Sequence, residues 1–196
     1  LSVCDYNLEK MGTKKNKARH KLLLDVCLAA KFEAESLIPD HEHYVAKYGD
    51  SGSTICTMLA RSFADIGDIV RGRDLYGGNK KKERLEEKLK QYFNNIYENL
   101  ESAAKKHYNG DKNNDFFQLR EDWWTANRAT IWEALTCDVD GSYFHATCSD
   151  SDGNSQYQTQ KQCRCDKEKA IKGSGGKAGD VNIVPTYFDY VPQYLR

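Results

Sequence analysis

The stretch Cys56–Tyr76 constrains the fold more than any other part of the chain. Its apolar side chains recur every three or four residues, which predicts a helix with a broad buried face. These positions are Ile55, Met58, Leu59, Phe63, Ile66, Ile69 and Val70. Ser53 stands at the expected N-cap and Gly72 at the expected helix end. We interpret the stretch as the central helix of a bundle.

The same stretch alternates opposite charges three or four residues apart, as in Arg61 with Asp65 and Asp68 with Arg71. On a helix packed on most sides, we expect these charges to pair with one another and with neighbouring helices. Asp65 and Asp68 could form a general acid and base. We favour a structural role instead, in which Arg61 and Arg71 neutralise them. No local signature suggests a Ser/His/Asp or Cys/His arrangement, and no cofactor is expected.

Composition limits the partners of the chain. Its formal net charge is zero over 196 residues, so any basic site must be a local patch, and nothing indicates a nucleic-acid partner. Only three residues are proline and long stretches lack turn residues, which favours helices over a sandwich of short strands. No apolar run is long enough to cross a bilayer.

Further helices are expected on both sides of the central one. One covers about Ala18 to Leu37 and is ended by Pro39. Another, of roughly 25 residues and nearly 40 Å, follows Gly77-Gly78-Asn79 and stops at Asn109-Gly110. A third runs to Cys137 after a capping box formed by Asp115 and Gln118.

The rest of the chain is expected to be mainly irregular. His41 to Gly52 reads as a loop, and residues 138 to 184 as a long insertion stapled by Cys148, Cys163 and Cys165. Pro185 stands where the first residue of a further helix would lie.

The seven cysteines favour an oxidising compartment. His41 and His43 could bind zinc with Cys148, Cys163 and Cys165, but the tight Cys-x-Cys spacing favours disulfides. The odd count, and a chain that opens without methionine, suggest a fragment whose missing flanks hold cysteine partners.

Two basic clusters and one aromatic pair could bind sugars. The clusters are Lys80, Lys81, Lys82 and Arg84, and Lys14, Lys15, Lys17, Arg19 and Lys21. Each is either a solvated face or a surface dense enough in charge for a sulfated glycan, whose binding would weaken with salt. Trp123 and Trp124 could stack on a sugar, but core packing suits so apolar a helix better.

Three blocks resemble the signature blocks of the Duffy-binding-like domain, alpha class, of Plasmodium falciparum erythrocyte membrane protein 1. They are LARSFADIGDIVRGRDLY (Leu59 to Tyr76), LREDWWTANRATIWEALTC (Leu119 to Cys137) and PTYFDYVPQYLR (Pro185 to Arg196). CDYNLEK near Cys4 and LLLDVCLAAKFEAESL also fit. The resemblance covers the whole chain in order.

This resemblance implies a mainly α fold, a disulfide-stapled helical bundle with long irregular loops. It implies a partial domain with the end of subdomain 1 at about 1–15, the helical subdomain 2 at about 16–138, and the start of subdomain 3 at about 139–196. It also implies that Cys56 pairs with Cys137, that Cys4 pairs upstream of the chain, and that Cys148, Cys163 and Cys165 pair within subdomain 3. Cys27 is left without an assigned partner.

The implied function is adhesion without catalysis, on the outer face of the infected erythrocyte, under antigenic variation. The implied partners are heparan sulfate-like glycans, blood-group sugars, complement receptor one, endothelial receptors, antibodies and an adjacent cysteine-rich interdomain region. We expect partner choice to lie in the irregular stretches 39–52, 77–84 and 138–184. The basic clusters are the residues most compatible with a glycan, and the alternative is a scaffold and antigenic spacer that binds nothing itself.

Overall fold

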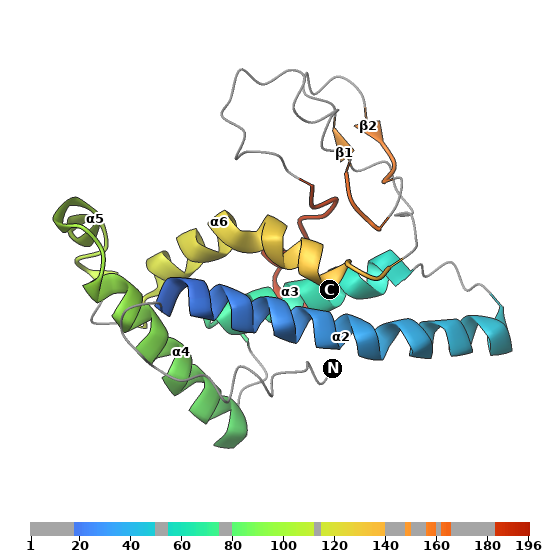
Figure 1. Ribbon diagram of the computed structural model, residues 1–196, viewed down its shortest axis with the longest axis horizontal. Coiled ribbons are helices and arrows are strands. Elements are labelled where there is room, and N and C mark those ends of the chain that lie inside the picture. The colour runs from blue at the N-terminus through green and yellow to red at the C-terminus, as the bar shows by residue number, and fades with distance from the viewer. Residues whose placement is uncertain are drawn as a thin grey trace.

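The computed structural model describes residues 18–49, 55–74, 80–111, 115–139, 148–149, 156–159, 162–165 and 183–196. Three long helices, α2 (Ala18–Tyr48), α3 (Ile55–Arg71) and α6 (Phe117–Leu135), pack against one another. A fourth, α4 (Lys80–Glu98), crosses them at the end where α2 begins (Figure 1). The predicted mainly helical, disulfide-stapled fold is confirmed.

Helix α3 lies at the centre, as its sequence predicts. Phe63 is fully buried, and its ring centroid lies 5.0 Å from those of both Trp124 and Trp132. A Cβ added to Gly67 would lie 2.8 Å from the Trp124 indole, so only glycine lets α6 approach this closely. Gly72 has a φ of +72° directly after the helix, which confirms the predicted end. The predicted N-cap, Ser53, lies outside the described residues.

Helix α2 differs from its prediction because it continues through Pro39 to Tyr48. A proline inside a helix cannot donate to the carbonyl four residues back. Pro39 leaves the carbonyl of Glu35 without its usual donor. Both residues are exposed, so water can donate to that carbonyl and the helix continues. Helix α2 is buried on one side only, because Leu24 and Phe32 are 58% and 43% exposed.

The predicted 25-residue helix is two helices, α4 and the short α5 (Ser102–His107). The amides of Asn99 and Leu100 donate to carbonyls only three residues back, at 3.1 Å each, which tightens the last turn and ends α4. The Asn99 side chain also donates to the Asn95 carbonyl at 2.7 Å. The apolar face of α4 is buried through Leu85, Leu89, Phe93 and Ile96.

The start of α6 lacks the predicted capping box. Asp115 and Phe116 both have left-handed backbones, with φ of 65° and 58°, and neither caps the helix by its side chain. The Asp111 carboxylate instead accepts the amides of Gln118 and Leu119, at 3.1 and 2.9 Å. Further along α6, Trp123 and Trp124 are buried, which confirms that they serve the core.

The C-terminal block forms two short 3-10 helices, η3 (Phe188–Tyr190) and η4 (Gln193–Leu195), and not the predicted helix from Pro185. Asp189 holds this block against α6. Its carboxylate accepts Trp124 Nε1 at 2.9 Å and two guanidinium bonds from Arg128, also at 2.9 Å. The docking of the block therefore depends on a buried ion pair.

Arg196 extends this ionic contact to α3. It pairs with Asp65, at 3.2 Å, and with Asp68, which also pairs with Arg71 at 3.0 Å. Burial raises the pKa of both carboxyl groups, and Arg196 partly opposes that rise. The two carboxylates are thus neutralised as expected, although Arg196 and not Arg61 is the partner of Asp65.

The disulfides correct the pairing of Cys56, which bonds to Cys163, while Cys137 is an exposed free thiol. The physical reason is the docking of residues 162–165 on the end of α6. There Trp132 donates to the Cys163 carbonyl at 2.9 Å, and Arg164 donates to Thr136 Oγ1 at 2.7 Å. This docking places Cys163, and not Cys137, at the first turn of α3. In the chain-entropy model a loop of this length contributes roughly 4.7 kcal/mol.

Cys148 pairs with Cys165, so disulfides and not zinc explain the three cysteines of this region, Cys148, Cys163 and Cys165. The bridge lies beside the strands β1 (Cys148–Ser149) and β2 (Gln156–Tyr157), which pair antiparallel. Cys27 is a half-buried free thiol, and Cys4 lies outside the described residues. Among the helices described here, none is long and apolar enough to span a membrane.

Candidate functional site

The predicted basic cluster at the start of α4 divides between two faces of the helix. Lys80 and Arg84 are exposed, and neither forms an ion pair with another described residue. Lys88, half-buried, lies four residues further on and shares their face. These three residues, which we call the basic face of α4, form a row about 12 Å long at 1.5 Å per residue. Lys88 was not predicted, although its four-residue spacing from Arg84 could have revealed it.

Lys82 lies on the other face and is not a free cation. Its Nζ forms an ion pair with the Asp74 carboxylate at 2.9 Å. Asp74 is carried by the segment after α3, so only the fold brings the two residues together. The side chain of Lys81, the remaining member of the cluster, lies outside the described residues.

The second predicted cluster is largely outside the described residues, which exclude Lys14, Lys15, Lys17 and the Arg19 side chain. Lys21 is half-buried on α2 beside Asp25, whose pKa is raised by burial and lowered by Lys21. Burial raises the pKa of Tyr92, and the nearby Asp25 adds to this rise. Tyr92 follows Lys88, the last residue of the basic face, by four residues, or roughly 6 Å along α4.

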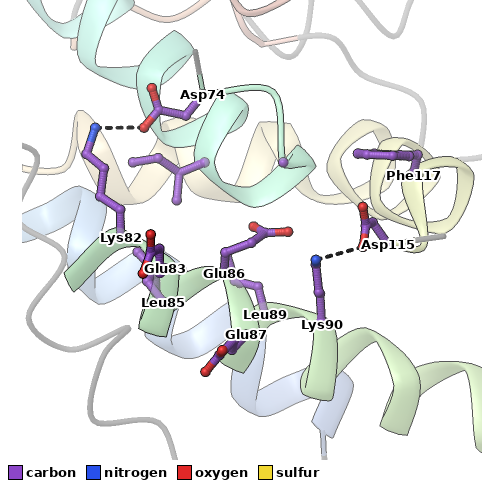
Figure 2. A pocket seen from close by; sticks show the side chains of 12 residues that line it. Asp74, Lys82, Glu83, Leu85, Glu86, Glu87, Leu89, Lys90, Asp115 and Phe117 are labelled. Carbon is purple, nitrogen blue, oxygen red and sulfur yellow. Dashed lines mark hydrogen bonds and ion pairs between the residues drawn. The ribbon is translucent and has the colours of Figure 1, made fainter. Parts of the chain in front are cut away.

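A groove of about 710 Å³ lies on the opposite face of α4, between α4, the end of α3 and the start of α6 (Figure 2). Ile69, Leu85, Leu89 and Phe117 supply its apolar lining. Figure 2 shows the Asp74–Lys82 pair at one end, the Asp115–Lys90 pair at the other, and Glu86 between them. We call this feature the α4 groove.

Arg120 fixes the shape of the α4 groove from beneath. Its guanidinium is fully buried and makes bonds of 2.6 and 2.8 Å to the two carboxylate oxygens of Glu86. It also donates to two carbonyls in the last turn of α3, Val70 at 2.6 Å and Ile69 at 3.2 Å, and the Ile69 carbonyl accepts the Gly72 amide as well. One side chain of α6 therefore joins α3 to α4 and holds α4 in position.

The chemistry of this region is that of a binding surface. The basic face of α4 offers an anionic partner three cations that form no ion pair with another described residue, whereas the α4 groove carries more carboxylates than amines. In the part of the chain that the structure describes, no group of three or more His, Cys, Asp or Glu side chains could hold a metal ion. Of the stretches expected to choose the partner, residues 39–48 are helical and not a loop.

Comparison with known proteins agrees with the fold. A family model described as the Duffy binding domain matches residues 1–196. A search of curated proteins finds no match.

Solved structures of Plasmodium falciparum membrane protein 1 (PfEMP1) domains are similar over nearly the whole chain. The NTS-DBL1(alpha-1) domain of the varO strain has 39% identity and a TM-score of 0.71, covering 98% of this chain and 39% of that one. The varO double domain of NTS-DBL1-alpha and CIDR-gamma has 37% identity and a TM-score of 0.72, covering 98% and 25%. The IT4var13 DBLbeta domain bound to ICAM-1 has 28% identity and a TM-score of 0.62, covering 98% and 40%. The chain thus spans well under half the length of each.

Proposed function

The chain belongs to the Duffy binding domain family, and on this premise we propose that it is a host-cell adhesion module whose basic face of α4 contacts sulfated glycans. The family is one of adhesion domains and not of enzymes. The observation that carries the proposal is the row of Lys80, Arg84 and Lys88. A sulfated glycan presents its charges along an extended chain, and such a row offers it successive cations.

The electrostatics of the helix favour the same partner. The N-terminal end of a helix carries a partial positive charge. Cations placed there destabilise the helix, and anions bound there stabilise it. Lys80 and Arg84 lie in the first two turns of α4, where the acidic Glu83 only partly offsets them. A sequence that concentrates cations at this end is better suited to binding an anion than to stabilising its own helix.

The similar proteins support the wider part of this proposal. A DBLbeta domain was solved with ICAM-1 bound, so at least one domain of this fold binds a host receptor. We place this role on the outer face of the infected erythrocyte. There the domain would take part in rosetting, through heparan sulfate-like glycans, blood-group sugars or complement receptor one. Antibodies and a neighbouring cysteine-rich interdomain region complete the proposed partners.

The test is retention of the oxidised, folded chain on heparin across a salt series. The triple variant Lys80→Glu, Arg84→Glu, Lys88→Glu should elute at clearly lower salt, because exposed charge interactions are screened and additive along a row. The matched control Lys47→Glu, Arg61→Glu, Lys106→Glu reverses three exposed cations elsewhere and should elute close to the unaltered chain. Equal losses in both variants would show only an effect of net charge.

The alternative is a scaffold and antigenic spacer that positions a neighbouring receptor-binding domain and binds nothing itself. The neutralisation of Lys82 by Asp74 favours it, since one expected cation is already occupied. A folded chain that shows no retention on heparin at physiological salt would support this alternative.

A further inference from the structure

The α4 groove has the features of a docking surface that differs from the basic face. It is open along one side, and its apolar lining comes from three helices. Phe117 stands at its edge and is 45% exposed, although it is a large aromatic residue. An apolar surface of this kind is commonly a site where another molecule packs.

The charges around the α4 groove are predominantly negative. Its lining contains five carboxylates and two amines: Asp74, Glu83, Glu86, Glu87 and Asp115, with Lys82 and Lys90. Lys82 neutralises Asp74, Lys90 pairs with Asp115 at 2.7 Å, and the buried Arg120 neutralises Glu86. Glu83 and Glu87 are exposed, and among the described residues neither forms an ion pair. Each of them lies three residues after a cation of the basic face, Lys80 or Arg84, so these two carboxylates stand between the α4 groove and the basic face.

We propose that the α4 groove docks a basic segment of a partner protein, with apolar side chains over Leu85, Leu89 and Phe117 and a lysine or arginine beside Glu83 and Glu87. Charge complementarity selects this occupant, because the lining repels an anionic glycan and attracts a cation. Lysine and arginine also carry long aliphatic stems, which suit a groove that is apolar within and charged at its edge. On helix α4 the acidic edge of the groove thus adjoins the basic face, and the two surfaces serve different partners.

The probe is a fluorescently labelled peptide of alternating lysine and leucine, and its binding to the folded 196-residue chain is followed by anisotropy. The double variant Glu83→Gln, Glu87→Gln should weaken binding by about tenfold or more, because both exposed carboxylates at the edge of the groove are removed. The control Glu42→Gln, Glu101→Gln removes two exposed carboxylates elsewhere and should leave binding unchanged. Phe117→Ala should weaken binding as well, while replacement of the peptide's leucines by serine should nearly abolish it.

Three outcomes would overturn the proposal. The double variant could bind as tightly as the unaltered chain, or the serine peptide could bind as tightly as the leucine peptide. Sedimentation could also show that the chain associates with itself through its own basic face, and that Lys80→Glu with Arg84→Glu abolishes this association. The heparin experiment is independent of these results, because loss of Glu83 and Glu87 should not reduce heparin retention and reversal of the basic face should not reduce peptide binding.

Discussion

Arg120 and Glu86 form a two-bond ion pair that joins α6 to α4, with N–O distances of 2.6 and 2.8 Å. The arginine is fully buried, whereas the glutamate side chain is 34% exposed. Because the same guanidinium also binds the last carbonyls of α3, this pair sets the position of α4 and hence of both its faces. Glu86 lines the α4 groove and Arg120 lies beneath it, so both surfaces proposed for binding depend on this one contact.

Replacement of Glu86 by glutamine should destabilise the fold by roughly 3 kcal/mol, because it leaves a buried guanidinium without its counter-charge. Urea unfolding measures this change. Glu87→Gln, one residue further on and exposed, is the control and should alter stability by less than about 0.5 kcal/mol. Equal stability of the two variants would contradict the role given to Arg120.

Gly67→Ala should destabilise the fold by about 1 to 3 kcal/mol, because the added methyl group would lie 2.8 Å from the Trp124 ring. Thermal unfolding followed by tryptophan fluorescence reports both the loss and the displaced indole. Gly110→Ala is the matched control, since an added Cβ there meets nothing within 4 Å. A normal midpoint for Gly67→Ala would mean that α3 and α6 are further apart than described.

Asp189→Asn should release the C-terminal block, because Arg128 would be left buried without a counter-charge and Trp124 would lose a charged acceptor. We expect a loss of roughly 3 to 5 kcal/mol in stability and earlier proteolytic cleavage within residues 183–196. Asp138→Asn, an exposed carboxylate, should change neither. Unaltered proteolysis in Asp189→Asn would show that other contacts hold the block.

The free thiols should differ in reactivity and in pH dependence. Burial raises the pKa of Cys27 to about 11 from 9.0, so at pH 8 its thiolate is roughly a hundredfold scarcer than in an ordinary thiol. Its alkylation should therefore be slow and should accelerate about tenfold per pH unit below pH 11, while the exposed Cys137 reacts first. Peptide-resolved mass spectrometry measures both rates. Labelling of Cys163 in the native chain, or protection of Cys137, would contradict the disulfide assignment.

The sequence predicted those parts of the fold that depend on a regular apolar period. The stripe from Leu59 to Val70 and the signal at Gly72 located α3, and the apolar stretch that contains Trp123 and Trp124 was correctly expected to be a helix, α6. The continuation through Pro39 and the break after Glu98 could not be predicted, because they depend on solvent exposure and on the hydrogen bonds of one turn. The pairing of Cys56 was wrong because the docking of Cys163 depends on contacts across more than 100 residues.

The sequence predicted the binding surface as the cluster Lys80 to Arg84, and the fold changes which residues belong to that surface. Composition alone located Lys80 and Arg84, but it could not show that Asp74 neutralises Lys82 across the turn after α3. Lys88 belongs to the same face and follows from helical spacing. The α4 groove left no signal in the sequence, because its lining comes from three separate helices.

The most direct test of the proposed function is binding of the folded chain to uninfected red cells, measured by flow cytometry with and without reversal of Lys80, Arg84 and Lys88. Our account predicts binding that weakens with salt, is competed by heparin, and is lost in this variant while the Lys47, Arg61 and Lys106 control still binds. Binding that survives reversal of the basic face, from a variant with normal unfolding behaviour, would contradict the account.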